Sequence, residues 1–142
     1  MKILLIQVLM AVASYSFAQN NRLTIHVTDL QNSKGQVILD VFSKEKGFPM
    51  KTEYAILRKK VTIPANGKVV FHLDDLQNGE YAFALIHDEN SNEKLDLNFI
   101  GIPKEGAGAS NNAKGFMSPP GYKDAKFNFN KSTEVTIKML YF

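Results

Sequence analysis

Residues 74–87, DDLQNGEYAFALIH, contain a turn followed by the strand around which the other predicted strands are arranged. The strand alternates two sets of side chains: Tyr81, Phe83, Leu85 and His87 on one face, and Ala82, Ala84 and Ile86 on the other. A period of two residues is typical of a β-strand. Because large residues alternate with alanine over most of its length, this pattern predicts a central strand that is packed on both faces.

The turn before this strand has its own characteristic spacing. Leu76 is followed by Gly79 three residues later and by Tyr81 after two more. This spacing is similar to the corner before a central strand in immunoglobulin-like and transthyretin-like sandwiches, where the tyrosine hydroxyl bonds to nearby backbone. We therefore expect the Tyr81 hydroxyl to bond to the preceding turn.

Alternating apolar segments continue on both sides of this strand. The predicted strands lie at residues 23–28, 36–42, 50–63, 69–73, 81–87, 125–129 and 135–141. The turn residues at 31–35 suggest that the first two strands form an opening hairpin, and a helical turn at 51–55 is an alternative start for the third. About seven strands without a helix-length amphipathic window predict an all-β fold, an antiparallel β-sandwich of immunoglobulin-like or transthyretin-like type. A small barrel is the alternative.

The N-terminal residues 1–18 have the features of a secretory signal peptide. Lys2 precedes an apolar run from Ile3 to Ala13, and the segment ends with the small residues Ser16 and Ala18. The apolar run is too short to span a bilayer, so we expect cleavage after Ala18 and no transmembrane segment afterwards. Residues 19–142 would then form a single domain that is soluble and periplasmic or extracellular.

Composition excludes several classes of protein. Cysteine is absent, which excludes disulfides, thiolate metal sites and a lipid-modified cysteine. The net charge of +3 comes from 17 basic and 14 acidic residues spread along the chain. Dispersed charge of this size favours solubility and does not indicate nucleic-acid binding. The densest basic cluster, residues 58–60, is typical of a solvated edge strand.

Residues 88–122 form a connection far longer than an ordinary loop. They contain five of the nine glycines and three of the five prolines, so we expect no regular element there. Five apolar side chains are expected to hold this loop against the sandwich: Phe99, Ile100, Ile102, Phe116 and Met117. A long loop of this kind, if structured, is usually functional.

The start of the loop has the spacing of a calcium-binding segment. The candidate ligands are Asp88, Asn90, Asn92, the carbonyl of Lys94, and Asp96. Oxygen atoms at alternate positions suit Ca²⁺, which takes six to eight oxygen ligands. Glu93 and Phe99 stand where an EF-hand has its glycine and its bidentate glutamate, so this is not an EF-hand; Glu89, Glu93 and Glu105 are possible completing ligands. The alternative is that these side chains cap their own turns.

The sequence favours a binding or structural module over an enzyme. Its expected partners are a glycan, a peptide or an envelope protein, contacted by the long loop. The alternative is an envelope hydrolase with its site around His87, Glu105 and Ser110, although no Gly-x-Ser-x-Gly motif is present. His87 alternates with core residues, which is more typical of a hydrogen-bonded structural histidine.

Four segments together resemble a known family. They are residues 87–112, HDENSNEKLDLNFIGIPKEGAGASNN, residues 124–127, the Gly47-Phe48-Pro49 segment, and the 76–81 corner. This combination resembles the domain of unknown function 2141 family of exported bacterial proteins. The resemblance implies a small exported β-sandwich with no established reaction. The chain departs from the family pattern at Glu93, where glycine is common, and at Ala109, where an aromatic residue is common.

Overall fold

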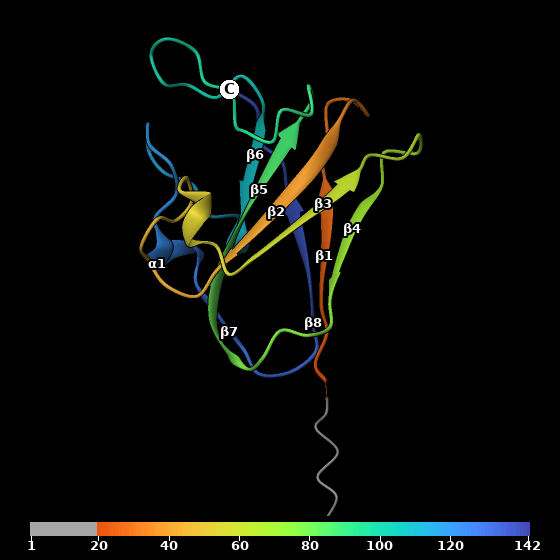
Figure 1. Cartoon of the computed structure of the whole chain (residues 1–142), viewed down its shortest axis with the longest axis vertical. Helices are drawn as coiled ribbons and strands as arrows, with labels where there is room; N and C mark the ends of the chain where they lie inside the picture. The colour runs from red at the N-terminus through yellow and green to blue at the C-terminus, as the bar shows by residue number, and fades with distance from the viewer. Residues whose placement is uncertain (1–19) are drawn as a thin grey trace, which may run out of the picture.

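The computed structural model describes residues 20–142 and shows two β-sheets packed face to face (Figure 1). The three-stranded sheet has the order β4-β1-β8, and the five-stranded sheet has the order β3-β2-β5-β6, with β7 also paired to β5. The strands are β1 Leu23–Thr28, β2 Gln36–Phe42, β3 Leu57–Thr62, β4 Val69–Leu73, β5 Gly79–Asp88, β6 Gly106–Ala109, β7 Phe127–Phe129 and β8 Thr133–Lys138. The predicted β-sandwich is confirmed, and the described part of the chain has eight strands in place of about seven.

Within residues 20–142, helical structure is limited to three short turns. They are η1 Thr52–Tyr54, η2 Ser110–Asn112 and α1 Tyr122–Ala125. No helix within residues 20–142 has the length and apolar character that crossing a membrane requires. The predicted signal peptide, residues 1–18, lies outside the described residues.

β5 is the central strand, as its alternation predicts. It pairs with β2 on one side and with β6 and β7 on the other. Its residues Tyr81, Phe83 and Leu85 lie in the core between the sheets, whereas Ala82 and Ala84 face a second cluster on the outer surface. The Tyr81 hydroxyl donates a hydrogen bond to the Gln77 carbonyl at 2.8 Å, so the predicted corner is also confirmed.

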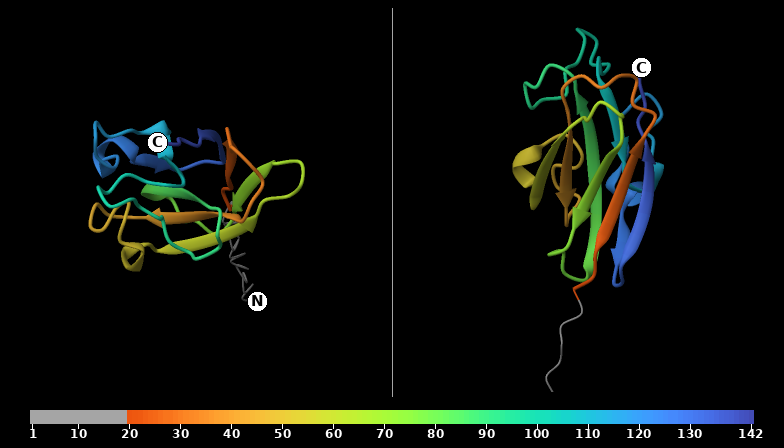
Figure 2. Two further views of the ribbon diagram at one scale, coloured as in Figure 1. Left: turned by 90° about the horizontal axis from the view of Figure 1, so that it is seen from above. Right: turned by 90° about the vertical axis from the view of Figure 1, so that its right-hand side faces the viewer.

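The expected opening hairpin is wrong. β1 pairs antiparallel with β4 and parallel with β8, while β2 lies in the other sheet between β3 and β5. Residues 29–35 therefore cross from one sheet to the other, as Figure 2 shows. The physical reason is burial: β2 is covered on both faces, whereas β1 is covered on alternate residues only. A strand buried on both faces belongs in the middle of the larger sheet.

The long loop is more regular than expected. It contains β6, η2 and the start of α1, so the expectation of no regular element there is wrong. The small side chains Ala82 and Ala84 let this segment approach the outer face of the five-stranded sheet closely. Tyr122 and Ala125 pack there against Phe42, and Phe48 joins them with its ring 5.8 Å from that of Tyr122.

Candidate functional site

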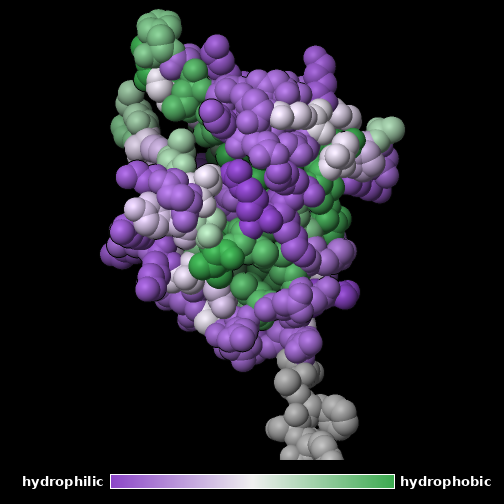
Figure 3. All heavy atoms as spheres, viewed as in Figure 1, coloured by the Kyte–Doolittle hydropathy of each residue, from purple (hydrophilic) through white to green (hydrophobic). Residues whose placement is uncertain are grey.

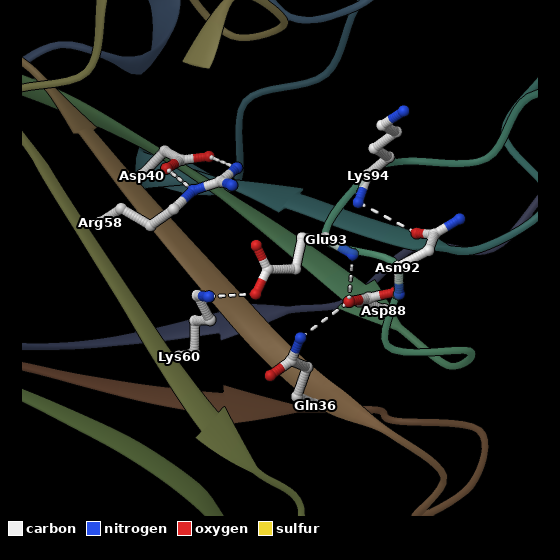
Figure 4. Close-up of polar contacts among 8 residues, drawn as sticks. All are labelled: Gln36, Asp40, Arg58, Lys60, Asp88, Asn92, Glu93 and Lys94. Atoms are coloured by element: carbon white, nitrogen blue, oxygen red, sulfur yellow. Dashed lines mark hydrogen bonds and ion pairs between the residues drawn. The ribbon is translucent and has the colours of Figure 1, made fainter. Parts of the chain in front are cut away.

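The long loop begins at Asp88, the last residue of β5, whose side chain is fully buried. Its carboxylate accepts hydrogen bonds from the backbone N–H groups of Asn92 at 3.1 Å and Glu93 at 2.9 Å. The Gln36 side chain donates a third bond at 2.8 Å, as Figure 4 shows. Glu93 has a left-handed φ of 66°, which the bond to Asp88 holds in place. Asp88 therefore caps the first turn of the loop.

A second buried carboxylate closes the base of the loop. Glu105 is 5 % exposed and lies immediately before β6. It accepts the backbone N–H of Glu89 at 3.0 Å with one oxygen and that of Asp96 at 3.1 Å with the other. A hydrogen bond from a backbone N–H to an ionised carboxylate is stronger than one to a neutral oxygen. Glu105 thus ties the two arms of the segment 89–96 to the edge of the sheet.

Between these anchors, the Asp and Asn side chains bond to one another. Asp96 accepts from the side-chain amide nitrogens of Asn90 at 2.7 Å and Asn92 at 2.9 Å. The pKa of Asp96 is lowered from its ordinary value, mainly by the hydrogen bond from Asn92 and then by that from Asn90. The amide oxygens turn the other way: that of Asn90 accepts the backbone N–H of Asn92, and that of Asn92 accepts the N–H of Lys94.

This orientation bears on the predicted calcium site. The backbone bonds direct the oxygens of Asn90 and Asn92 into the turns and leave their N–H groups facing Asp96. An amide N–H cannot coordinate a cation. Within the described part of the chain, no three His, Asp or Glu side chains are grouped to hold a metal. Calcium binding through Asp88, Asn90, Asn92, Lys94 and Asp96 stays a prediction, and it requires these two amides to turn around.

Basic residues of the edge strand β3 are engaged in intramolecular bonds. Arg58 makes a bidentate contact with the buried Asp40, at 2.7 and 2.9 Å, and this hydrogen bond raises the pKa of Arg58. Lys60 pairs with Glu93, which links the loop to the outer face of the sheet (Figure 4). Lys59 donates to the His72 carbonyl. Since each cation has a partner, this cluster is not an open binding patch.

The three residues of the hydrolase alternative have separate roles in the fold. His87 is fully buried, with Nδ1 2.6 Å from the Tyr141 hydroxyl and Nε2 2.9 Å from the Lys34 carbonyl. Ser110 accepts the N–H of Phe83 at 3.0 Å and donates to the Ala125 carbonyl at 2.6 Å. The side chains of His87, Ser110 and Glu105 make no hydrogen bonds to one another. His87 is the hydrogen-bonded structural histidine that its strand position predicts.

The apolar residues of the loop point outward. In residues 97–103, here called the first tip, the exposed fraction is 99 % for Phe99 and 65 % for Ile100. In residues 115–118, here called the second tip, the exposed fraction is 92 % for Phe116 and 94 % for Met117. Ile102, also in the first tip, is 41 % exposed. The expectation that these side chains hold the loop against the sandwich is wrong, because the hydrogen bonds of Asp88 and Glu105 hold it instead.

Backbone geometry explains why the first tip projects. The N–H of Gly101 donates to the Asn98 carbonyl at 3.0 Å, which makes Phe99 and Ile100 the central residues of a β-turn. The side chain of Asn98 also accepts the N–H groups of Ile100 and Ile102, at 3.0 and 2.9 Å. Central turn positions usually hold Gly, Pro, Asn, Asp or Ser, so two large apolar residues there are unusual. Figure 3 shows the resulting apolar surface at the upper left, where this tip projects.

The second tip is also a tight turn. A Cβ added to Gly115 would lie 2.0 Å from the Ser118 carbonyl oxygen, so only glycine fits there. Met117 adopts a left-handed φ of 53°, which is strained for a long side chain. In Figure 1 the segments that contain the two tips both lie at the upper left, away from the β7–β8 turn. The sequence did contain a signal for the first tip, because Asn98 and Gly101 flank two apolar residues at turn spacing.

Two hollows in the surface lie elsewhere. One has a volume of about 370 Å³ and lies beside β3 and β4, where Ile56, Leu57 and Leu76 line it. The other, of about 220 Å³, is lined by residues of β6, by Asn112 to Lys114, by Lys138 at the end of β8 and by Leu140. Neither is lined by an exposed side chain of a tip. The tips are therefore convex features and not the walls of a pocket.

Comparison with known proteins gives one match. A family model described as DUF2141, uncharacterized protein conserved in bacteria, matches residues 25–138. No curated protein and no solved structure matches the chain. The matched range runs from β1 to the end of β8, so it includes both sheets and the whole loop.

Proposed function

Because the chain belongs to this family of uncharacterized bacterial proteins, we propose a function from the geometry of the chain itself: it is an exported binding module that contacts its partner with the first and second tips. Export is supported by the signal-like sequence of residues 1–18. The partner is an envelope component with an apolar surface. Of the partners that the sequence suggests, a peptide or an envelope protein suits these tips better than a glycan does.

The observation that carries this proposal is the exposure of Phe99, Phe116 and Met117, each above 90 %. Burying one such side chain stabilises a contact by about 1.5–3 kcal/mol. Clusters of exposed apolar side chains on a soluble domain typically mark an interaction site. Three of them on the turns of one loop are therefore available to stabilise a complex.

The rigidity of the loop supports the same proposal. Asp88 and Glu105 are buried and accept four backbone N–H bonds from residues 89, 92, 93 and 96. Side-chain bonds from Asn98 then hold the first tip. A preorganised loop loses less conformational entropy on binding than a mobile one. The apolar side chains are thus presented in a defined arrangement before the partner arrives.

Calcium is a separate prediction about the same loop. Asp88 and Asp96 would supply the charged oxygens, and the ion would stiffen the segment before the first tip. The present bonds of Asn90 and Asn92 do not favour this arrangement. The proposed function does not depend on the ion, because the two buried carboxylates already order the loop.

Site-specific photo-crosslinking in cells tests the proposed function. A photoreactive phenylalanine analogue is placed at Phe99, and in a matched variant at Lys131. Lys131 is exposed in the turn between β7 and β8, at the opposite end of the molecule in Figure 1. We expect adducts from position 99, with protein or lipid, that position 131 does not form. Equal labelling from the two positions, or none from position 99, would overturn the proposal.

A further inference from the structure

The exposed charged side chains of residues 97–120 are all positive. Between Leu97 and Pro120 the only acidic residue is Glu105, which is buried and bonded to backbone N–H groups. The two lysines of this segment, Lys104 and Lys114, are exposed. Neither makes an ion pair within residues 20–142. Each tip therefore has an unpaired cation next to its apolar side chains.

The carboxylates nearest in sequence make no ion pair with Lys104 or Lys114 within residues 20–142. Asp96 is bonded to the amides of Asn90 and Asn92, and Glu93 is paired with Lys60 on the outer face of the sheet. The ammonium groups of Lys104 and Lys114 are consequently free to contact anions outside the molecule. An apolar tip with adjacent lysines matches a surface with an apolar interior and anionic groups above it.

The convex shape of the two tips favours a bilayer over a protein partner. A protein would need two separate pockets, at matching distance, for two convex turns. A fluid bilayer accepts each projection independently, because its lipids rearrange around an inserted side chain. Phenylalanine and isoleucine bury at the boundary of headgroups and acyl chains, while lysine keeps its ammonium group at the headgroups.

We propose that the first and second tips dock the domain on an anionic lipid bilayer, with Phe99, Ile100, Phe116 and Met117 inserted and with Lys104 and Lys114 on the lipid headgroups. This inference rests on the proposed function, since it names the partner of the same tips. Each lysine near an anionic surface increases the membrane affinity about fivefold. The sandwich itself stays in water, and its hydrogen-bonded loop sets the depth of insertion.

Tryptophan fluorescence tests this inference directly, because the chain contains no tryptophan. The variants Phe99→Trp, Phe116→Trp and, as the matched control, Lys131→Trp are titrated with vesicles. One set of vesicles is phosphatidylcholine with about one third phosphatidylglycerol, and the other is phosphatidylcholine alone. We expect the emission at positions 99 and 116 to shift to shorter wavelength with the anionic vesicles and less with the neutral ones. Emission at position 131 should stay unchanged.

The lysines are tested in the Phe99→Trp background. Lys104→Gln with Lys114→Gln should weaken partition to anionic vesicles by about twenty-five-fold, whereas Lys131→Gln should change it less than about twofold. High salt should weaken partition of the parent chain and affect the double lysine variant less, because salt screens the charge contribution. If Lys131→Gln weakened partition as much as the double variant does, the role of the tips would be contradicted.

The outcomes separate this inference from the function on which it rests. If Phe99→Trp and Phe116→Trp show no shift with anionic vesicles while photo-crosslinks from position 99 carry protein, the bilayer is excluded and the binding module stands. If crosslinks are also absent, both proposals fail. A shift at position 131 equal to that at position 99 would indicate nonspecific adsorption and overturn the membrane inference. Each tryptophan reports on the surroundings of its own position. Membrane binding through an apolar segment elsewhere in the chain would therefore not shift the emission at the tips alone.

Discussion

The carboxylate of Glu105 accepts the backbone N–H of Asp96 at 3.1 Å, nine residues earlier in the chain, and its other oxygen accepts that of Glu89 at 3.0 Å. One buried side chain therefore holds the two ends of the segment that leads to the first tip. Both N–H groups are partly buried and lie outside the strand ladders, so this side chain supplies the acceptor that no strand partner provides. The order of the loop depends on this carboxylate.

Replacing Glu105 tests that dependence. Glu105→Ala leaves two backbone donors without their acceptor, so we expect a loss of about 2–5 kcal/mol in the free energy of unfolding. Glu105→Gln keeps one acceptor oxygen and should lose less. Urea denaturation measures both variants, with the exposed Glu53→Ala as control, for which a change within about 0.5 kcal/mol is expected. An Ala variant as stable as the parent chain would contradict the anchoring role.

The second prediction compares two phenylalanines of opposite burial. Phe83 is 1 % exposed in the core, whereas Phe99 is 99 % exposed at the first tip. Phe83→Ala should cost about 3–5 kcal/mol in the free energy of unfolding, because transfer and cavity terms add. Phe99→Ser should change it by less than about 0.5 kcal/mol. Thermal unfolding followed by circular dichroism measures both, and a large loss for Phe99→Ser would show that the tip packs against the sandwich.

The calcium prediction is tested by giving the loop two more carboxylates. In Asn90→Asp with Asn92→Asp, one oxygen of each side chain can keep its bond in the turn while the other faces Asp96. We expect calcium to raise the melting temperature of this double variant more than that of the parent chain. Calcium that binds only the folded state contributes about 2.7 kcal/mol at a hundredfold excess over its Kd.

Asp88→Ala in the same background is the control, and it should lose the calcium effect. A parent chain whose melting temperature rises as much as that of the double variant would show that Asn90 and Asn92 turn their oxygens to the ion. In that case the five predicted ligands coordinate calcium in the parent chain. Melting curves in chelator and in millimolar calcium distinguish the two results.

The fourth prediction concerns acid. The pKa of folded Asp96 is depressed below its ordinary value of 3.8, because Asn92 and Asn90 donate to its ionised form. Its contribution to loop stability is therefore fully present above that ordinary value and is lost as pH falls through the lower folded value. We expect the side-chain amide protons of Asn90 and Asn92 to lose protection from exchange in this acid range, as measured by nuclear magnetic resonance. Asp96→Asn should remove the dependence on pH, and unchanged protection in the parent chain would contradict the prediction.

Local patterns predicted the elements of this fold well. The alternation from Tyr81 to His87 and the spacing from Leu76 to Tyr81 depend on neighbours in the chain, so the central strand and its corner could be recognised directly. The pairing of the strands could not be recognised in this way. Leu23 lies opposite Leu73 on one side and Thr133 on the other, and a period of two residues does not encode such distant partners.

The candidate site divides in the same way. The sequence by itself determined that residues 88–122 form a long connection and that His87 belongs to the strand, and it offered turn capping by the Asp and Asn side chains as the alternative to a calcium site. Only the tertiary structure decided that Glu105 closes the loop and that Phe99, Phe116 and Met117 face outward. The reason is that capping is a contact between near neighbours, whereas the direction of an apolar side chain depends on whether distant strands leave space beside it. Here Tyr81, Phe83 and Leu85 of β5 pack in the core between the sheets, and Phe42, Tyr122 and Ala125 cover the outer face of β5, so both faces are covered without the tips and the tip side chains remain in water.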